Sequence, residues 1–265
     1  MKSGAPLSMF TLAERPDLAR SARRLSGQIW QGTEFIQHDD VVNRHWGALF
    51  DLFASLQFVL CDTGGTVVAA GHTIPVAWDG SVGDLPSGVG GVLERGTRDH
   101  GIRPPNTLSA LLAVVEPGRQ GDGLSRQVLT GMKILAARRG FSALIAPVRP
   151  TLKSRYPLAP MERYIHWTRA DGTPLDPWLR THWRMGAETL TVASVSMLVT
   201  GTVSEWEGWT GMALPESGEY VVPGALVPVR IDRERDLGRY EEPNVWMRHP
   251  VTTADARLTV PAAQD

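Results

Sequence analysis

The fold is decided by the stretch Leu108-Ser-Ala-Leu-Leu-Ala-Val-Val-Glu-Pro-Gly-Arg-Gln-Gly-Asp-Gly-Leu124. Its first eight residues are mostly apolar and too few for a buried helix of ordinary length, so they predict a strand covered on both faces. Residues 116–123 predict a tight glycine turn, and apolar side chains at helical spacing follow until Gly140. A strand, a glycine turn and a helix N-terminus together present unpaired backbone N–H groups to an anion. This stretch therefore predicts a binding site for a phosphate-bearing ligand.

The composition is typical of a globular protein with no strong overall charge. Of the 265 residues, 42% are hydrophobic and 21% are charged, and the net charge is −1. Such a charge provides no field for binding nucleic acid or an anionic membrane. The single cysteine, Cys61, excludes an internal disulfide and fits a reducing compartment. Because there is also no long apolar run and no signal-peptide core at the start, we expect a cytoplasmic protein.

The remaining pattern predicts a mixed α/β sheet in a single domain covering 1–265. Residues 79–107 are rich in Gly, Pro, Asp and Ser and predict a long loop. Residues from about 201 to 265 predict an elaborated C-terminal extension, whose tail after Asp232 packs through Tyr240 and Trp246. The other predicted elements are a strand at 7–12, helices at 17–26 and 42–53, a hairpin of strands 57–61 and 66–76, a strand at 142–148, a helix at 177–185, a strand at 188–200, and a pair of strands within 219–231 separated by Pro223-Gly224.

Two nucleotide-binding interpretations of the glycine turn fail on the residues themselves. A phosphate loop of the Walker type needs Gly-Lys-Ser/Thr, which does not follow here. A dinucleotide fingerprint needs a glycine at position 126, where the chain has Arg126, and it needs a preceding βαβ unit in place of the predicted hairpin. Neither nucleotide motif therefore accounts for the turn, and the alternative to an anion site is a solvated turn with a helix N-cap.

The run Val115-Glu-Pro-Gly-Arg-Gln-Gly-Asp-Gly-Leu124 resembles the pyrophosphate-binding motif of the GNAT acyltransferase superfamily, Gln/Arg-x-x-Gly-x-Gly/Ala. The predicted order of elements from residue 7 to about 230 is similar to that fold. The first motif position departs from the pattern, because Gly118 replaces Gln or Arg. The resemblance implies a mostly antiparallel twisted sheet flanked by helices, with a central parallel pair, 108–115 and 142–148, that splays to hold an acyl-CoA.

The resemblance also implies which residues bind the pyrophosphate of acetyl-CoA or another acyl-CoA. Backbone amides of the turn take most of this role, and Arg119 and Gln120 supply a basic and an amide side chain. The side chain of Asp122 should point to solvent, since its charge would repel a phosphate. No metal is expected, because the seven histidines are scattered and no cysteine pair exists. The predicted cofactor-binding residues are Val115, Arg119, Gln120, Gly121, Asp122, Gly123, Leu124 and Ser125.

Two residues are candidates for proton transfer during acylation of an amine. Family members often place a tyrosine acid four residues before a glycine on the helix after the fifth strand. Counted back from Gly186, that position is His182, and histidine can donate or accept a proton near neutrality. Glu116, at the end of the central strand, is a candidate base. The alternatives are a helix histidine with a local partner and an exposed loop carboxylate.

The predicted function is transfer of an acetyl or larger acyl group from acyl-CoA to an amine of a small-molecule acceptor. The resemblance implies direct transfer in a ternary complex. Two alternatives remain open: a non-catalytic acyl-CoA-binding or regulatory module, and an acyltransferase whose donor is an acyl carrier protein. Aromatic segments 178–183 and 205–209, with Lys153, Arg155 and Tyr156, predict an acceptor pocket, a hydrophobic seam or the interface of a homodimer.

Overall fold

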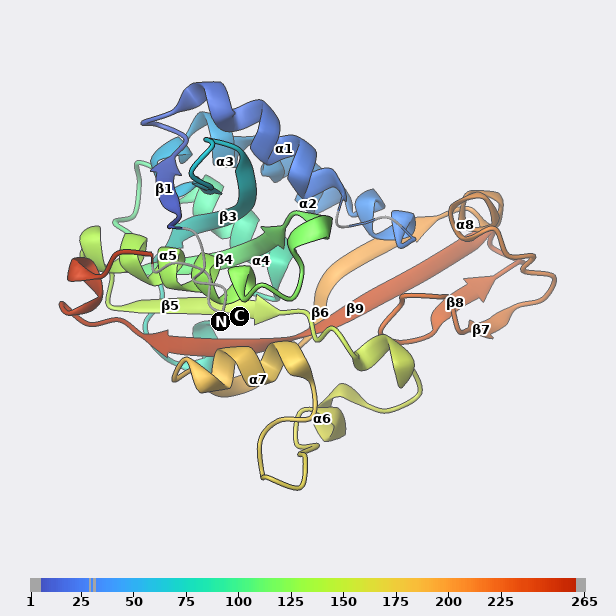
Figure 1. Ribbon diagram of the computed structural model, residues 1–265. Helices are drawn as coiled ribbons and strands as arrows, with labels where there is room; N and C mark the ends of the chain where they lie inside the picture. The colour runs from blue at the N-terminus through green and yellow to red at the C-terminus, as the bar shows by residue number, and fades with distance from the viewer. Residues whose placement is uncertain (1–5, 29, 31, 261–265) are drawn as a thin grey trace.

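The computed structural model describes residues 6–28, 30 and 32–260 as helices around one nine-stranded sheet (Figure 1). The strands follow the order β1-β2-β3-β4-β5-β9-β8-β7, and β6 pairs along β9. All neighbouring pairs are antiparallel except β4 with β5. The strands are β1 Ser8–Thr11, β2 Phe58–Cys61, β3 Val67–Val76, β4 Thr107–Val115, β5 Ala143–Val148, β6 Glu188–Gly201, β7 Gly218–Tyr220, β8 Val229–Asp232 and β9 Leu237–Pro250.

Helices cover both faces of this sheet. On β3, Ala70 packs against the α1 residue Ala22, whereas its neighbour Gly71 faces Val128 of α5, since successive residues of a strand point to opposite faces. In Figure 1, α1 and α3 lie above the sheet and α7 lies below β5 and β9. No described helix has the length and apolar character needed to span a membrane. The helices are α1 Ala19–Gln28, α2 Asp40–Trp46, α3 Ala48–Asp51, α4 Val89–Arg98, α5 Leu124–Arg138, α6 Met161–Tyr164, α7 Pro177–Arg184 and α8 Val203–Thr210.

The parallel pair β4 and β5 splays, as the resemblance implied. The two strands pair only at residues 107–109 with 143–145, although β4 continues to Val115 and β5 to Val148. The cause lies in β4: Ala110 and Leu112 pair with consecutive residues of β3, so Leu111 is an extra, bulged residue. A bulge bends its strand and increases the local twist. It stands two residues after the last β4–β5 pair, where it turns β4 away and opens a wedge.

The prediction of a loop at 79–107 was wrong, because α4 occupies its middle. Val92 and Leu93 are buried on one face of this helix. The glycines that indicated a loop allow close packing instead: a Cβ on Gly96 would lie 2.5 Å from Ile74, and one on Gly88 would lie 2.2 Å from the Ser196 backbone. The glycine content was misleading here, because glycine occurs where another segment packs closely against the backbone as well as in turns.

The region after 201 is more deeply integrated than an appended extension. The tail after 232 is the strand β9, which inserts between β5 and β6 along the middle of the sheet. The long β6–β9 ribbon runs past the end of β5 and carries α8, β7 and β8 (Figure 1). We call residues 202–236, with the distal ends of β6 and β9, the second lobe. It has its own core, centred on Phe35, Trp206 and Tyr240.

Candidate active site

The wedge between β4 and β5 has free backbone edges. Beyond residue 109, β4 hydrogen-bonds only to β3, and beyond residue 145, β5 hydrogen-bonds only to β9. Each strand therefore turns one row of unpaired N–H and C=O groups toward the gap. An extended ligand that carries amide groups can pair with such an edge as an added strand would. The pantetheine arm of an acyl-CoA is a chain of this kind.

The glycine turn at the mouth of the wedge has the backbone geometry of an anion-binding turn. Within the described part of the chain, the backbone N–H groups of Gly121, Gly123, Leu124 and Ser125 donate no hydrogen bond. Gly121 and Gly123 have φ angles of 96° and 73°, which non-glycine residues rarely adopt. The free N–H groups stand at the start of a 15-residue helix whose dipole also attracts negative charge. The turn therefore suits a pyrophosphate.

The other predicted residues of the turn differ in their surroundings. The Nε of Arg119 lies 2.7 Å from the Asp122 carboxylate, and both side chains remain partly exposed. This contact neutralises the carboxylate that we expected to point freely to solvent, and it occupies part of the Arg119 guanidinium. Gln120 is exposed, whereas Leu124 is buried and anchors the helix in the core. Val115 ends β4 and Ser125 begins the first turn of α5; both are half-buried.

Glu116 lies with the turn, at the mouth of the wedge. Along β4 it stands seven residues beyond Ser109, the last residue paired with β5, which corresponds to about 23 Å of extended strand. The side chain is half-buried beside Gly118, where a Cβ would approach its carboxylate to 3.0 Å. The structure therefore brings Glu116 to the end of the wedge that carries the glycine turn, and away from the point where β4 and β5 separate.

His182 lies on α7 against β9, the strand next to β5. Its helix, α7, begins at Asp176, whose carboxylate accepts hydrogen bonds from the N–H groups of Trp178 and Leu179. The His182 side chain is buried, and its Nδ1 lies 2.9 Å from Nε2 of His249 on β9. His249 pairs with Leu144, one residue before the point where β4 and β5 separate.

Burial keeps both rings of this histidine pair neutral. It lowers the pKa of His182 well below the usual value, and the neighbouring His249 acts in the same sense. Burial lowers the pKa of His249 to about 4; Lys133 adds to this effect and the Met185 carbonyl opposes it. Each neutral imidazole carries one N–H group, so in their hydrogen bond one ring donates and the other accepts. Sequence reasoning missed His249, because its place beside α7 depends on strand pairing.

A second buried polar group at the end of β5 was also missed. The Nε of Arg149 lies 2.9 and 3.0 Å from the two carboxylate oxygens of Glu242, which is fully buried. The Tyr240 hydroxyl and the Asn244 amide donate to the same carboxylate. Arg149 also donates to the carbonyl of Gly224, so the group ties the second lobe to the sheet. The local sequence carries no signal of this long-range contact.

The residues predicted for an acceptor pocket have mixed roles. Lys153 is buried, and its ammonium donates to the carbonyls of Tyr156 and Leu226, while burial lowers its pKa to about 8. It therefore fastens the segment after β5 to the second lobe. Tyr156 is 40% exposed and packs edge-on against Trp167 at 5.1 Å, so it remains available to a ligand.

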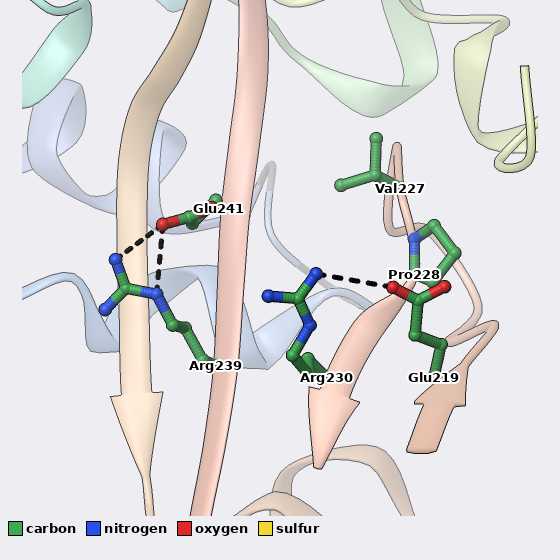
Figure 2. A pocket seen from close by; sticks show the side chains of 6 residues that line it. All are labelled: Glu219, Val227, Pro228, Arg230, Arg239 and Glu241. Carbon is green, nitrogen blue, oxygen red and sulfur yellow. Dashed lines mark hydrogen bonds and ion pairs between the residues drawn. The ribbon is translucent and has the colours of Figure 1, made fainter. Parts of the chain in front are cut away.

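A surface depression of the second lobe lies between β7, β8 and β9 (Figure 2). Its charged residues form two exposed ion pairs, Arg230 with Glu219 at 3.5 Å and Arg239 with Glu241 at 2.5 Å. Val227 and Pro228 complete its lining. Its charges already have partners, and neither β4 nor β5 contributes to it, so it is separate from the wedge.

Known proteins share both the sequence and the fold of this chain, although no family model matches it. The arginine N-acetyltransferase avaD of Aspergillus versicolor is 34% identical over 276 residues, which cover 92% of this chain and 94% of that protein. The loading GNATL domain of CurA from Lyngbya majuscula has a TM-score of 0.59 at 16% identity, covering 92% of this chain and 98% of that one. The GphF GNAT-like decarboxylase, solved with isobutyryl-CoA, has a TM-score of 0.52 at 16% identity, covering 93% of this chain and 100% of that one. The chain belongs to the GNAT superfamily and is an acyl-CoA-dependent N-acyltransferase.

Proposed function

We propose that this enzyme transfers an acetyl group from acetyl-CoA to an amine nitrogen of arginine or a closely related small molecule. The observation that carries the proposal is the 34% identity to an arginine N-acetyltransferase, because it extends over nearly the full length of both proteins. The free strand edges and the uncapped turn support acetyl-CoA as the donor.

The proposed reaction is direct transfer while donor and acceptor are both bound. The only cysteine, Cys61, is buried in β2 against the α1 side of the sheet, two strands away from β4. It is therefore badly placed to carry the acyl group as a thioester. An amine that reaches the apex of the wedge can attack the acyl carbonyl itself, with a nearby side chain managing its proton.

We infer that this side chain is His182, because its ring contacts His249 on β9, and His249 pairs with β5 one residue before the last β5 residue that pairs with β4. Glu116 remains a predicted base, but its place at the pyrophosphate end supports His182 over it. His182→Ala is expected to lower kcat by roughly a hundredfold. Glu116→Gln should leave kcat within about threefold, because only groups that transfer the proton contribute that factor.

The test is a transfer assay with a panel of amines, read out by released thiol and by the mass of the product. Arginine, agmatine, citrulline, ornithine and a peptide with an N-terminal arginine separate the acceptor's guanidine, amine and carboxylate groups. We expect acetylated arginine or one of its small analogues. Binding of acetyl-CoA without transfer to any amine would instead support a non-catalytic module. Transfer only from an acyl carrier protein would support the carrier-dependent alternative.

A further inference from the structure

The glycine turn contains an ion pair that a phosphate site does not obviously need. The Nε of Arg119 lies 2.7 Å from the carboxylate of Asp122. A carboxylate in a turn that binds an anion repels that anion. Both side chains are also partly exposed, and ion pairs of this kind contribute little to stability. Stability alone therefore does not account for a carboxylate at position 122.

Arg119 is the one cationic side chain of the turn, residues 116–123. The family motif has Gln or Arg at the position of Gly118, so the turn lacks the side chain that the motif supplies there. Within the described part of the chain, only Nε of the Arg119 guanidinium forms a hydrogen bond, which leaves both Nη groups able to donate. An arginine presents its donors in a rigid planar fork that suits a phosphate. Arg119 can therefore take over the role of the missing side chain.

The position of Asp122 keeps this fork beside the ligand. Asp122 stands in the chain between Gly121 and Gly123, whose backbone N–H groups are among those left unpaired at the start of α5. The guanidinium that it holds therefore lies close to the anion that these N–H groups would bind. A free arginine side chain has many rotamers, and fixing one of them during binding costs affinity. The ion pair fixes the fork before the ligand arrives.

We propose that Asp122 is a positioning residue that holds the Arg119 guanidinium ready for the pyrophosphate of acetyl-CoA. This inference rests on the proposed function through its donor. Arg119 contacts the phosphate, and Asp122 acts through Arg119. The two effects of Asp122 on the donor oppose each other, because its charge repels the phosphate while its hydrogen bond orders the fork. Two neutral variants separate these effects.

The first test is the Kd of CoA for Asp122→Asn and Asp122→Ala, measured by isothermal titration calorimetry. Both variants remove the charge, but only the asparagine oxygen can still accept a hydrogen bond from Nε of Arg119. We expect the alanine variant to bind CoA roughly twofold to tenfold more weakly than the asparagine variant. Ordering a long side chain costs about 0.5–1.5 kcal/mol, and 1.4 kcal/mol is a factor of ten. Equal Kd values in the two variants would overturn the proposal.

The second test adds Arg119→Met to each variant. The difference between the alanine and asparagine variants should then vanish, because no guanidinium is left to be positioned. In the Asp122→Ala protein the ion pair is already absent, yet Arg119→Met should raise the Kd of CoA roughly tenfold further, since a charge-assisted hydrogen bond to the phosphate is lost. If the pair served only to shape the turn, this further loss would not occur, and its absence would refute the proposal.

A matched control is the ion pair of Asp232 and Arg235 in the second lobe, which has the same spacing along the chain. Asp232→Asn and Asp232→Ala should bind CoA as the wild type does. An alanine–asparagine difference at position 232 as large as that at position 122 would count against a specific role of Asp122. Wild-type protein that binds no CoA would refute the donor and the proposed function with it, whereas CoA binding with equal Asp122 variants would refute the positioning role alone.

Discussion

Replacement of the buried carboxylate of Glu242 should be among the most damaging single changes in this protein. Both oxygens of Glu242 accept from Arg149, and the Tyr240 hydroxyl and the Asn244 amide also donate to them. Glu242→Gln keeps the shape but turns one acceptor oxygen into an NH₂ group. At least one donor then loses its partner, and the Arg149 guanidinium loses its counter-charge.

The expected size follows from burial. Removing one partner of a buried ion pair costs about 3–5 kcal/mol, because the remaining charge is left uncompensated. The side chain of Arg149 is 27% exposed, so water can relieve part of this cost. We therefore expect a loss of about 3 kcal/mol in the free energy of unfolding. For a chain of this size that corresponds to a fall of roughly 6–12 °C in Tm.

Urea unfolding of Glu242→Gln and of a matched control measures this loss. The control is Glu241→Gln, the adjacent residue, whose carboxylate pairs with Arg239 at the surface, with 42% of each side chain exposed (Figure 2). A surface pair of that kind contributes about 0.2–1 kcal/mol. Equal losses in the two variants would contradict the view that burial, and not ion-pair formation itself, determines the cost.

Three further predictions follow from the structure. Gly121→Val, at a φ of 96°, should raise the KM for acetyl-CoA roughly tenfold, because valine strains the backbone of the turn. Gly101→Val introduces similar strain at a φ of 73° but lies outside the turn, so it should leave that KM unchanged in the same assay. Gly71→Ala should destabilise by about 1–3 kcal/mol, since its Cβ would lie 2.4 Å from the Phe58 ring, while Gly27→Ala, in an open position on α1, should stabilise by about 0.5 kcal/mol in urea unfolding. Burial, with a smaller contribution from Arg23, lowers the pKa of His72 to about 4. As the pH falls, the unfolded chain therefore binds a proton at His72 before the folded protein does. The contribution of His72 to the free energy of unfolding should be complete above pH 6.5 and decline toward pH 4. His72→Gln should weaken that decline, whereas His166→Gln, at an exposed position, should not. An equal decline in the wild type and both variants would count against His72 as its source.

The sequence alone predicted those parts of the protein that depend on neighbouring residues. The strand, glycine turn and helix at 108–139 were predicted nearly to the residue, because apolar spacing and positive φ angles are properties of the local chain. The hairpin of β2 and β3 and the helix α7 were predicted for the same reason. The resemblance to the GNAT superfamily, confirmed by the comparisons, rested on that one local motif and on the order of the elements.

Only the tertiary structure revealed how distant segments meet. Gly88 and Gly96 could not be distinguished from the glycines of a loop, because the residues they pack closely against, Ser196 and Ile74, lie elsewhere in the chain. His249 and Glu242 were missed for a related reason: β9 reaches the centre of the sheet by pairing with β5, about a hundred residues earlier. Strand register of this kind arises from the packing of whole layers and is not encoded in any short window. The chain near 116–125 therefore predicted an anion site by itself, whereas the contact between His182 and His249 exists only because the folded sheet places β9 against α7.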